Sequence, residues 1–272
     1  MDDATARTAT AERAARAGGA VARERFREPL DVETKTGPLD VVTAADREAQ
    51  RAVIAAIEGE EEFAGEPLVC EENSSPPGTD TSIGKSLPET GRAWVVDPID
   101  GTANYVRGLR HWTTSVAAVE NGEPVGAATR LPALGDSYTA GPEGATRNGE
   151  RVTVSDRTDP ATCTLGLLGW WGGEREPASI HRVGSNRFGG FRRFGSMQAT
   201  LALVAAGGLD GAVTRVSPHP WDTIAGVHLV RAAGGTATDI HGDRWTDGAS
   251  GLVVSNGRIH DRLVGLMRDS GS

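Results

Sequence analysis

The hydrophobic pattern of the first half predicts helices followed by a sheet. Residues 3–26 are rich in alanine with interspersed charges, and a second run has apolar residues at helical spacing over 49–57, so two helices are expected. Short apolar runs typical of strands lie at 67–70, 93–96, 113–120 and 124–129. Asn121-Gly122 separates the last two runs, and Asn-Gly between strands is a strong hairpin signal. We therefore expect two helices and an antiparallel sheet, with an exposed connection over 73–92.

The pattern changes near residue 155, where strands and helices begin to alternate. Strands are expected at 162–169, 210–214, 236–240 and 251–255, and helices at 196–206, 221–233 and 259–267. Ser196 is a typical N-cap, and a pair of glycines follows each of the first two helices. The alternation predicts an α/β arrangement. We expect an α+β part over residues 1–150 and an α/β part over residues 151–272.

Composition narrows the functional classes. The chain has 272 residues, enough for a sizeable core, and its formal net charge of −9 argues against nucleic acid as a partner. Only two of its 28 basic residues are lysines, a bias that fits a GC-rich genome or a high-salt cytoplasm. Cys70 and Cys163 lie in apolar, strand-like runs, and no secretory signal or membrane-spanning run is present. A cytoplasmic protein without a membrane partner is expected.

Residues 93–104 carry the strongest chemical signal. The apolar run over 93–96 predicts a buried strand that stops at Asp97-Pro98, since proline restricts the backbone of both residues. Asp97 and Asp100 would then face one point across a turn, with the carbonyl of Ile99 between them. A helix starting at Gly101-Thr102 would offer free N–H groups to an anion. The stretch predicts a cation site beside a phosphate site; alone, it also fits a turn followed by a helix cap.

Other carboxylates strengthen the prediction of a metal site. Asp46, Glu71 and Asp222 also lie beside predicted strand ends or turns. An all-oxygen set suits Mg²⁺, with Mn²⁺ or Ca²⁺ as alternatives, and does not suit zinc. Two or three such ions can activate water and neutralise a phosphoryl group. Each acid also has a structural explanation: Asp46 completes a capping box with Thr43, Glu71 could be a solvated strand end, and Asp222 could cap a helix.

Together, four segments resemble the inositol monophosphatase family of Mg²⁺-dependent, lithium-sensitive phosphatases, which includes fructose-1,6-bisphosphatases. The segments are residues 40–46, 70–72, 94–104, and 221–226 with 232–235. They occur in the family's order at similar spacing, and the resemblance covers roughly residues 10–268. It implies a layered αβαβα sandwich, which is an α+β fold, and a homodimer.

The resemblance also implies metal ligands. Glu71, Asp97 and the carbonyl of Ile99 would hold one Mg²⁺, and Asp97, Asp100 and Asp222 a second. A third, weaker ion would use Glu71 and water. The part over residues 1–150 would thus carry most ligands, while the part over 151–272 would add Asp222 and the substrate pocket.

The same resemblance assigns the remaining catalytic roles. Asp46 and Thr102, with Glu71, would position and deprotonate the attacking water. The N–H groups of Gly101 and Thr102 would bind the phosphate. Lys35 would lie in a mobile loop over the site.

The substrate pocket is expected to include Gly195 and Ser196. Arg215 stands where inositol-preferring relatives usually have a carboxylate, and guanidinium suits phosphate. Archaeal dual-specificity relatives are similar here and over 192–196. We hypothesise that Arg215, with Arg192 or Arg193, faces a second phosphate, which favours fructose 1,6-bisphosphate with additional inositol-1-phosphatase activity. The alternative is that Arg215 pairs with a nearby acidic residue.

Several alternatives stay open. Within the family these are an inositol monophosphatase proper, a nucleotide-3′-phosphatase and a histidinol-phosphatase. A haloacid-dehalogenase-type phosphatase fits poorly, since its signature aspartates are two apart and these are three apart around a proline. A non-catalytic regulatory protein would not need all five acids.

Overall fold

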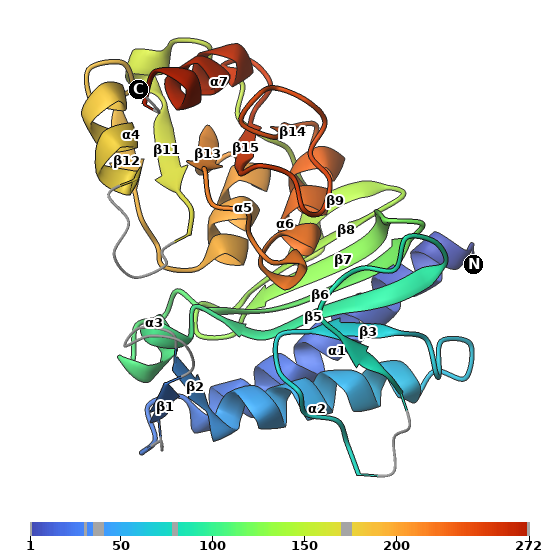
Figure 1. Ribbon diagram of the computed structural model, residues 1–272. Coiled ribbons are helices and arrows are strands. Elements are labelled where there is room, and N and C mark those ends of the chain that lie inside the picture. The colour runs from blue at the N-terminus through green and yellow to red at the C-terminus, as the bar shows by residue number, and fades with distance from the viewer. Residues whose placement is uncertain (1, 30–31, 35–40, 78–80, 170–175, 271–272) are drawn as a thin grey trace.

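The computed structural model describes residues 2–29, 32–34, 41–77, 81–169 and 176–270. Figure 1 shows five layers: α1 and α2, an eight-stranded sheet, α5 and α6, a five-stranded sheet, and α4 with α7. This αβαβα sandwich is the α+β fold that the resemblance implied. The boundary expected at residue 150 stays a prediction. None of the described helices is both long and apolar enough to cross a membrane.

The helices lie within a few residues of their predicted positions where a prediction was made. They are α1 Asp3–Arg25, α2 Ala44–Glu58, α3 Thr102–Val106, α4 Glu176–Gly184, α5 Met197–Ala205, α6 Pro220–Ala232 and α7 His260–Asp269. The capping box of α2 and the Ser196 cap of α5 are both present. The helix α4 was not predicted from the sequence.

The strands form a small hairpin and two sheets. The hairpin pairs β1 Val32–Thr34 with β2 Val41–Thr43. The first sheet contains β3 Leu68–Cys70, β4 Ile83–Gly84, β5 Arg92–Asp100, β6 Thr113–Glu120, β7 Glu123–Leu131, β8 Asp136–Gly141, β9 Gly144–Arg147 and β10 Glu150–Val152. The second contains β11 Thr164–Leu167, β12 Gly190–Arg192, β13 Gly211–Thr214, β14 Thr236–Thr238 and β15 Leu252–Ser255. A short 3₁₀ helix, Pro160–Thr162, precedes β11.

The first sheet is mixed, which corrects the expectation of an antiparallel sheet. Its strand order is β10-β9-β8-β7-β6-β5-β3-β4, and β3 runs parallel to both β4 and β5. Parallel neighbours need a crossover connection longer than a hairpin turn, and twelve residues separate β3 from β4. The connection expected over 73–92 therefore contains a strand, β4.

The strand β5 does not stop at Asp97-Pro98, as predicted, but continues to Asp100 through a β-bulge. Asp97 pairs with Ser115 and Asp100 with Thr113, so one extra residue of β5 stands opposite β6. Proline has no N–H to donate to the ladder, and a bulge accommodates it. The carbonyl of Pro98 accepts a hydrogen bond from Thr114 Oγ1 at 2.8 Å. The bulge turns two aspartates toward the second half of the chain.

The two Asn-Gly turns have the backbone that their sequences predict. The φ angles are 51° and 80° at Asn121-Gly122, and 53° and 83° at Asn148-Gly149. Positive φ at both central residues is the geometry of the type I′ hairpin, which matches the twist of the flanking strands. These turns fix the registers of β6 with β7 and of β9 with β10.

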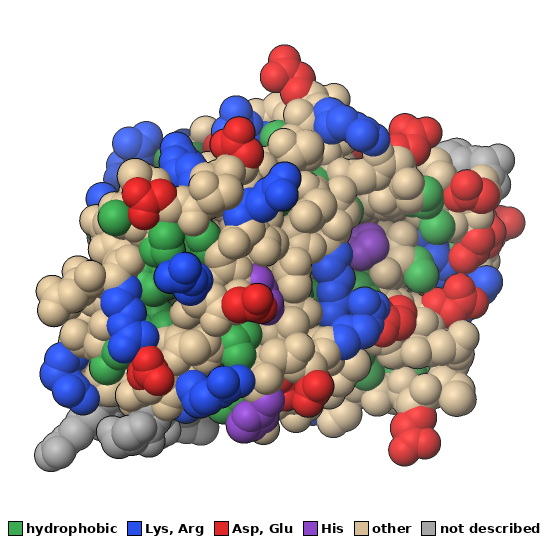
Figure 2. All heavy atoms as spheres, turned by 90° about the horizontal axis from the view of Figure 1, so that it is seen from above, with side chains coloured by type: hydrophobic (Ala, Val, Ile, Leu, Met, Phe, Trp, Pro, Cys, Tyr) green, Lys and Arg blue, Asp and Glu red, His purple; other side chains and the backbone are tan. Residues whose placement is uncertain are grey.

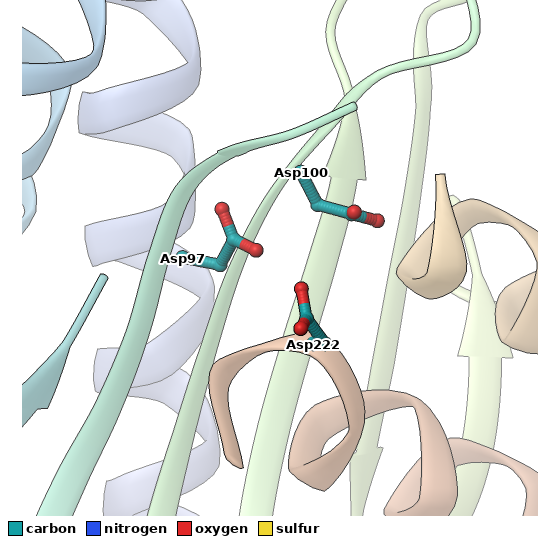
Figure 3. Close-up of side chains that lie close together, drawn as sticks. All are labelled: Asp97, Asp100 and Asp222. Carbon is teal, nitrogen blue, oxygen red and sulfur yellow. The ribbon is translucent and has the colours of Figure 1, made fainter. Parts of the chain in front are cut away.

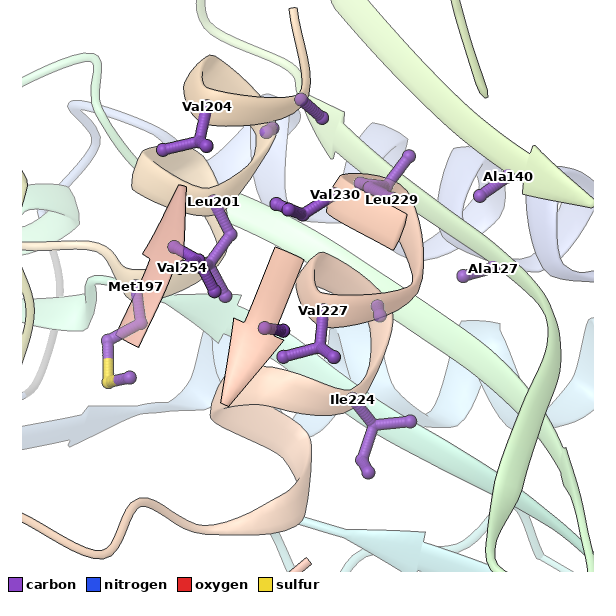
Figure 4. Close-up of a cluster of buried hydrophobic side chains, with 14 of the residues drawn as sticks. Ala127, Ala140, Met197, Leu201, Val204, Ile224, Val227, Leu229, Val230 and Val254 are labelled. Carbon is purple, nitrogen blue, oxygen red and sulfur yellow. The ribbon is translucent and has the colours of Figure 1, made fainter. Parts of the chain in front are cut away.

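The main core lies where α5 and α6 are enclosed between the two sheets (Figure 4). Leu201 and Val204 of α5 and Val227 of α6 are fully buried. They pack with Val254 of the second sheet and Ala127 of the first. Both helices are apolar around most of their circumference because each is covered on two sides. Cys70 and Cys163 are buried free thiols in separate cores.

The surface carries charges of both signs. Figure 2 shows the face seen from the side of α4 and α7, on which basic and acidic side chains are interspersed. Among the described residues, the exposed large hydrophobic side chains are Leu109 and Leu134. Isolated apolar residues in a mixed-charge surface are typical of a solvated face.

The contact between α5 and α6 generates a stability prediction. A Cβ added at Gly226 would lie 2.5 Å from Leu201 Cβ, which is not a flexible chain end. We expect Gly226→Ala to destabilise the protein by about 2 kcal/mol, because the helices must move apart. At Gly265 in α7, an added Cβ would have no atom of the described residues within 4 Å beyond its chain neighbours and the nearby backbone of its own helix, so Gly265→Ala should stabilise the protein by about 0.5–1 kcal/mol. Urea unfolding of both variants measures the difference; equal stability of the two would contradict this packing.

A buried histidine generates a prediction on acid stability. His228 Nε2 is buried and has no hydrogen-bond partner in the part of the chain that the structure describes. Burial, followed by the Arg231 charge, lowers the pKa of His228 to about 4. The unfolded chain therefore binds this proton first as pH falls from about 6.5 toward 4, and stability decreases over that range. At pH 5 this contribution amounts to about 2 kcal/mol. In urea unfolding, the free energy of unfolding of the wild type should fall between pH 7.5 and 5, and that of His228→Leu should fall by about 2 kcal/mol less. His241→Leu, at an exposed position, should behave as the wild type.

Candidate active site

Three buried aspartates from distant parts of the sequence meet between the layers. Asp97 and Asp100 come from the bulged end of β5, and Asp222 comes from the first turn of α6 (Figure 3). One carboxylate oxygen of each lies within 4.8 Å of the others. Their side chains point into a common space, and all three residues are at most 8 % exposed. The structure thus brings together three of the predicted ligands.

The charges of these aspartates oppose one another. Burial raises the pKa of Asp97 well above its usual range, and the carboxylates of Glu71, Asp100 and Asp222 raise it further. Asp97 Oδ1 is buried and has no hydrogen-bond partner among the described residues. Buried like charges are unfavourable unless a cation compensates them. Because all of the donors are oxygens, the cluster fits a hard divalent cation such as Mg²⁺ or Mn²⁺.

The N-terminus of α5 holds Asp100. Its Oδ2 accepts hydrogen bonds from Ser196 Oγ at 2.5 Å and from the backbone N–H of Gln198 at 2.7 Å. Burial raises the pKa of Asp100 to about 6, while these hydrogen bonds act in the opposite direction. A carboxylate at a helix N-terminus gains from both capping and the helix dipole. Ser196 was predicted to bind substrate; the structure shows that its hydroxyl holds the predicted metal ligand Asp100.

Gln198 continues this network to the third aspartate. Its Nε2 donates to the carbonyl of Trp221 at 2.6 Å, directly before Asp222. The helix α5 thus connects the end of β5 with the start of α6. Gln198 was not predicted from the sequence, since an amide in an apolar helix carries no functional signal by itself.

Glu71 and Glu72 follow directly on β3. The backbone N–H of Glu71 donates to Val96 O at 3.2 Å, which places Glu71 beside the end of β5, and its charge contributes to the raised pKa of Asp97. Gln50 of α2 binds both backbone groups of Glu72, at 2.7 Å to its carbonyl and 2.9 Å to its N–H. Gln50 was also not predicted, although its spacing of four residues from Asp46 places both on one face of α2.

Asp46 has the capping role that the sequence offered, and it also contacts Thr102. Its Oδ2 accepts hydrogen bonds from the N–H and hydroxyl of Thr43, which completes the capping box of α2. Its Oδ1 lies 3.1 Å from Thr102 Oγ1, which is also 3.0 Å from the carbonyl of Ile99. Burial raises the pKa of Asp46 to about 6. One carboxylate thus caps a helix and contacts the threonine predicted to act with it.

Gly101 and Gly195 approach each other where β5 ends. Gly101 has a φ of 91°, and an added Cβ would lie 3.0 Å from the carbonyl oxygen of Gly195 and 3.1 Å from that of His111. Gly195 has a φ of 72°, beside Asn104. Asn104 Nδ2 donates at 2.6 Å to both His111 O and Phe194 O. These contacts hold residues 194–196 against the start of α3; the anchoring by Asn104 was not predicted.

Two of the three arginines predicted to bind substrate have described hydrogen bonds to other residues. Arg192 is exposed, with Nη1 donating to Phe191 O at 2.9 Å. Arg193 is also exposed. Arg215 follows β13, and its Nη2 donates to Ser270 Oγ at 3.1 Å. Their contact with a second phosphate stays a prediction, and Lys35 lies outside the described residues.

The sequence is similar to those of known proteins over most of its length. The chain is 36 % identical over 241 residues to a fructose-1,6-bisphosphatase/inositol-1-monophosphatase of Thermotoga maritima, covering 88 % of this chain and 87 % of that protein. It is 34 % identical to an inositol-1-monophosphatase of Rhizobium meliloti, covering 91 % and 90 % of the two chains. It is 32 % identical to the Nus factor SuhB of Escherichia coli K12, covering 95 % and 94 %.

Solved structures show the same fold. An IMPase structure from Thermotoga maritima matches with a TM-score of 0.82 at 33 % identity, covering 95 % of each chain. An inositol monophosphatase from Anabaena matches with a TM-score of 0.81 at 27 % identity, covering 98 % of this chain and 97 % of the other. The resemblance inferred from four short segments therefore extends over the whole fold.

The match to the family itself covers residues 3–272. The family is metal-dependent and its members hydrolyse phosphoric monoesters, which agrees with the buried acidic cluster. The chain belongs to the inositol monophosphatase family and is a phosphoric monoester hydrolase.

Proposed function

We propose that the protein is a Mg²⁺-dependent phosphatase of a small sugar or polyol phosphate that uses water as its nucleophile. The observation that carries the proposal is the convergence of Asp97, Asp100 and Asp222 in a buried, all-oxygen cluster. Glu71, Asp97 and Ile99 O would hold one ion, and Asp97, Asp100 and Asp222 a second, while a third would bind Glu71 and water. Bound Mg²⁺ supplies an activated water and neutralises the phosphoryl charge.

The protein's own groups would orient and deprotonate that water. Thr102 Oγ1 lies 3.1 Å from Asp46 Oδ1. The pKa of Asp46 is raised to about 6, which makes this carboxylate a better proton acceptor than an ordinary aspartate. Thr102 can relay a proton from water to Asp46 through its hydroxyl. Gly101 and Thr102 would bind phosphate oxygens with their backbone N–H groups. Burial of the site keeps these hydrogen bonds and charges effective.

For the substrate we propose fructose 1,6-bisphosphate, with inositol 1-phosphate as a second substrate. Two observations support this proposal: an arginine at position 215 and the activity for which the Thermotoga relative is named. A guanidinium can bind phosphate through two parallel hydrogen bonds, whereas the carboxylate usual in inositol-preferring relatives would repel it. An inositol monophosphatase proper, as in the Rhizobium relative, is the second candidate. A homodimer is proposed from the family resemblance.

The wild-type protein provides the primary test. We expect Mg²⁺-dependent phosphate release from both esters, with faster turnover of fructose 1,6-bisphosphate, at low and high KCl. EDTA should abolish release, and excess Mg²⁺ should restore it. Preference for inositol 1-phosphate would support the second candidate, and failure to hydrolyse either ester would overturn both.

Asp222→Asn tests the metal site. Replacing this carboxylate should lower kcat/KM for both esters by about 10³-fold or more, because a predicted ligand of the metal is lost. Asp269→Asn, which breaks an exposed ion pair with Arg187, should change kcat/KM less than twofold. Urea unfolding verifies that both variants are folded. Activity of Asp222→Asn within tenfold of the wild type would contradict the assigned ligand set.

Arg215→Ala tests how the substrate is chosen. We expect kcat/KM for fructose 1,6-bisphosphate to fall by about 30- to 100-fold, as for a lost charge-assisted hydrogen bond, and that for inositol 1-phosphate by less than about threefold. Arg16→Ala, at an exposed position of the outer helix α1 where Arg16 pairs with Glu12, serves as the control for loss of a positive charge. Equal losses on the two esters would show that Arg215 does not bind a second phosphate.

A further inference from the structure

Lys85 is placed at the metal site by the parallel pairing of β3 and β4. Leu68 pairs with Ile83 and Val69 with Gly84. Lys85 directly follows β4 and therefore lies level with Cys70. Its Nζ donates to Cys70 O at 2.9 Å and to Glu71 O at 2.6 Å. The ammonium group therefore binds the carbonyls of two consecutive residues: the last residue of β3 and the predicted metal ligand Glu71 that follows it.

The same ammonium group contacts the other half of the site. Lys85 Nζ lies 5.3 Å from the ring centroid of Trp221, within the range of a cation–π interaction. Trp221 directly precedes Asp222, and its ring also stacks on His219, with centroids 4.6 Å apart and planes 15° apart. Its carbonyl is held by Gln198 Nε2 at 2.6 Å. Trp221 is thus fixed on its backbone side and on its ring, and Lys85 links that ring to β3.

We propose that Lys85 is a positioning residue that sets the spacing between Glu71 at the end of β3 and Asp222 at the start of α6. This inference rests on the proposed metal-dependent function. A compact ammonium with three donors can bind two carbonyls while its charge lies against an aromatic ring. Glu71 is in turn positioned from the opposite side, because Gln50 binds the backbone of Glu72.

Position and charge predict opposite effects on the metal. A positive charge near a dication disfavours binding, so if Lys85 acted through charge alone, its removal would tighten Mg²⁺ binding, most strongly at low salt. If Lys85 acts by fixing the spacing of the ligands, its removal weakens Mg²⁺ binding, and this effect persists when salt screens the charge. The sign of the change separates the two.

The test compares full-length Lys85→Met, which keeps an unbranched side chain without donors or charge, with Lys85→Arg. Mg²⁺ binding is measured directly by titration calorimetry and by the Mg²⁺-dependent rise in Tm, at 0.15 M and 1 M KCl. We expect Lys85→Met to raise the Kd for Mg²⁺ by about tenfold at both salt concentrations, as for other residues that orient metal ligands. Lys85→Arg, which keeps donors and charge, should stay within about threefold of wild type. Turnover of Lys85→Met at saturating Mg²⁺ should recover to within about threefold.

A matched charge control is Arg92→Met. Arg92 lies at the opposite end of β5, is exposed, and pairs with Asp3 and Glu120. Arg92→Met should leave the Kd for Mg²⁺ unchanged or lower it slightly, since one positive charge is lost. Unchanged or tighter binding by Lys85→Met, or equal weakening by Arg92→Met, would overturn the role of Lys85. Absence of Mg²⁺ binding by the wild type would instead overturn the proposed metal-dependent function.

Discussion

Mutual repulsion among buried carboxylates is the constraint on which this structure depends. Asp97, Asp100 and Asp222 place oxygens within 4.8 Å of one another in the interior, and Glu71 adds to the negative charge around Asp97. Such a cluster is unfavourable by itself, so the surrounding protein must hold it together. A divalent cation would compensate these charges directly, which is why the arrangement supports a metal-dependent reaction.

The layered fold supplies the groups that hold the cluster. The bulge in β5 turns Asp97 and Asp100 toward the second half of the chain, and the N-terminus of α5 donates to Asp100. The helix α6 lies between the sheets with its first turn at the same point, so Asp222 completes the cluster (Figure 3). The close contact at Gly226 and the buried side chains of α5 and α6 keep that helix in place. Packing energy thus compensates the electrostatic energy of the site.

Sequence patterns predicted much of the fold because the relevant signals are local. Ser196 as a cap, Thr43 with Asp46 as a capping box and Asn121-Gly122 as a hairpin all act within a few residues, and each is present in the structure. The prediction failed where pairing partners are distant in sequence. Whether β3 meets β5 in a parallel or antiparallel sense depends on the path of the intervening chain, which no local pattern encodes. The bulge at Pro98 likewise depends on the neighbouring strand β6.

The sequence by itself determined the chemistry: five acidic residues in four segments, with no histidine or cysteine pattern for zinc, indicated a hard-cation phosphatase and its family. Only the tertiary structure decided which side chains support those acids. Four side chains make hydrogen bonds to backbone groups of residues distant in sequence: those of Gln50, Asn104, Gln198 and Lys85. Hydrogen bonds to the backbone require a particular distance and direction but no particular partner side chain, and so they leave no motif in the sequence.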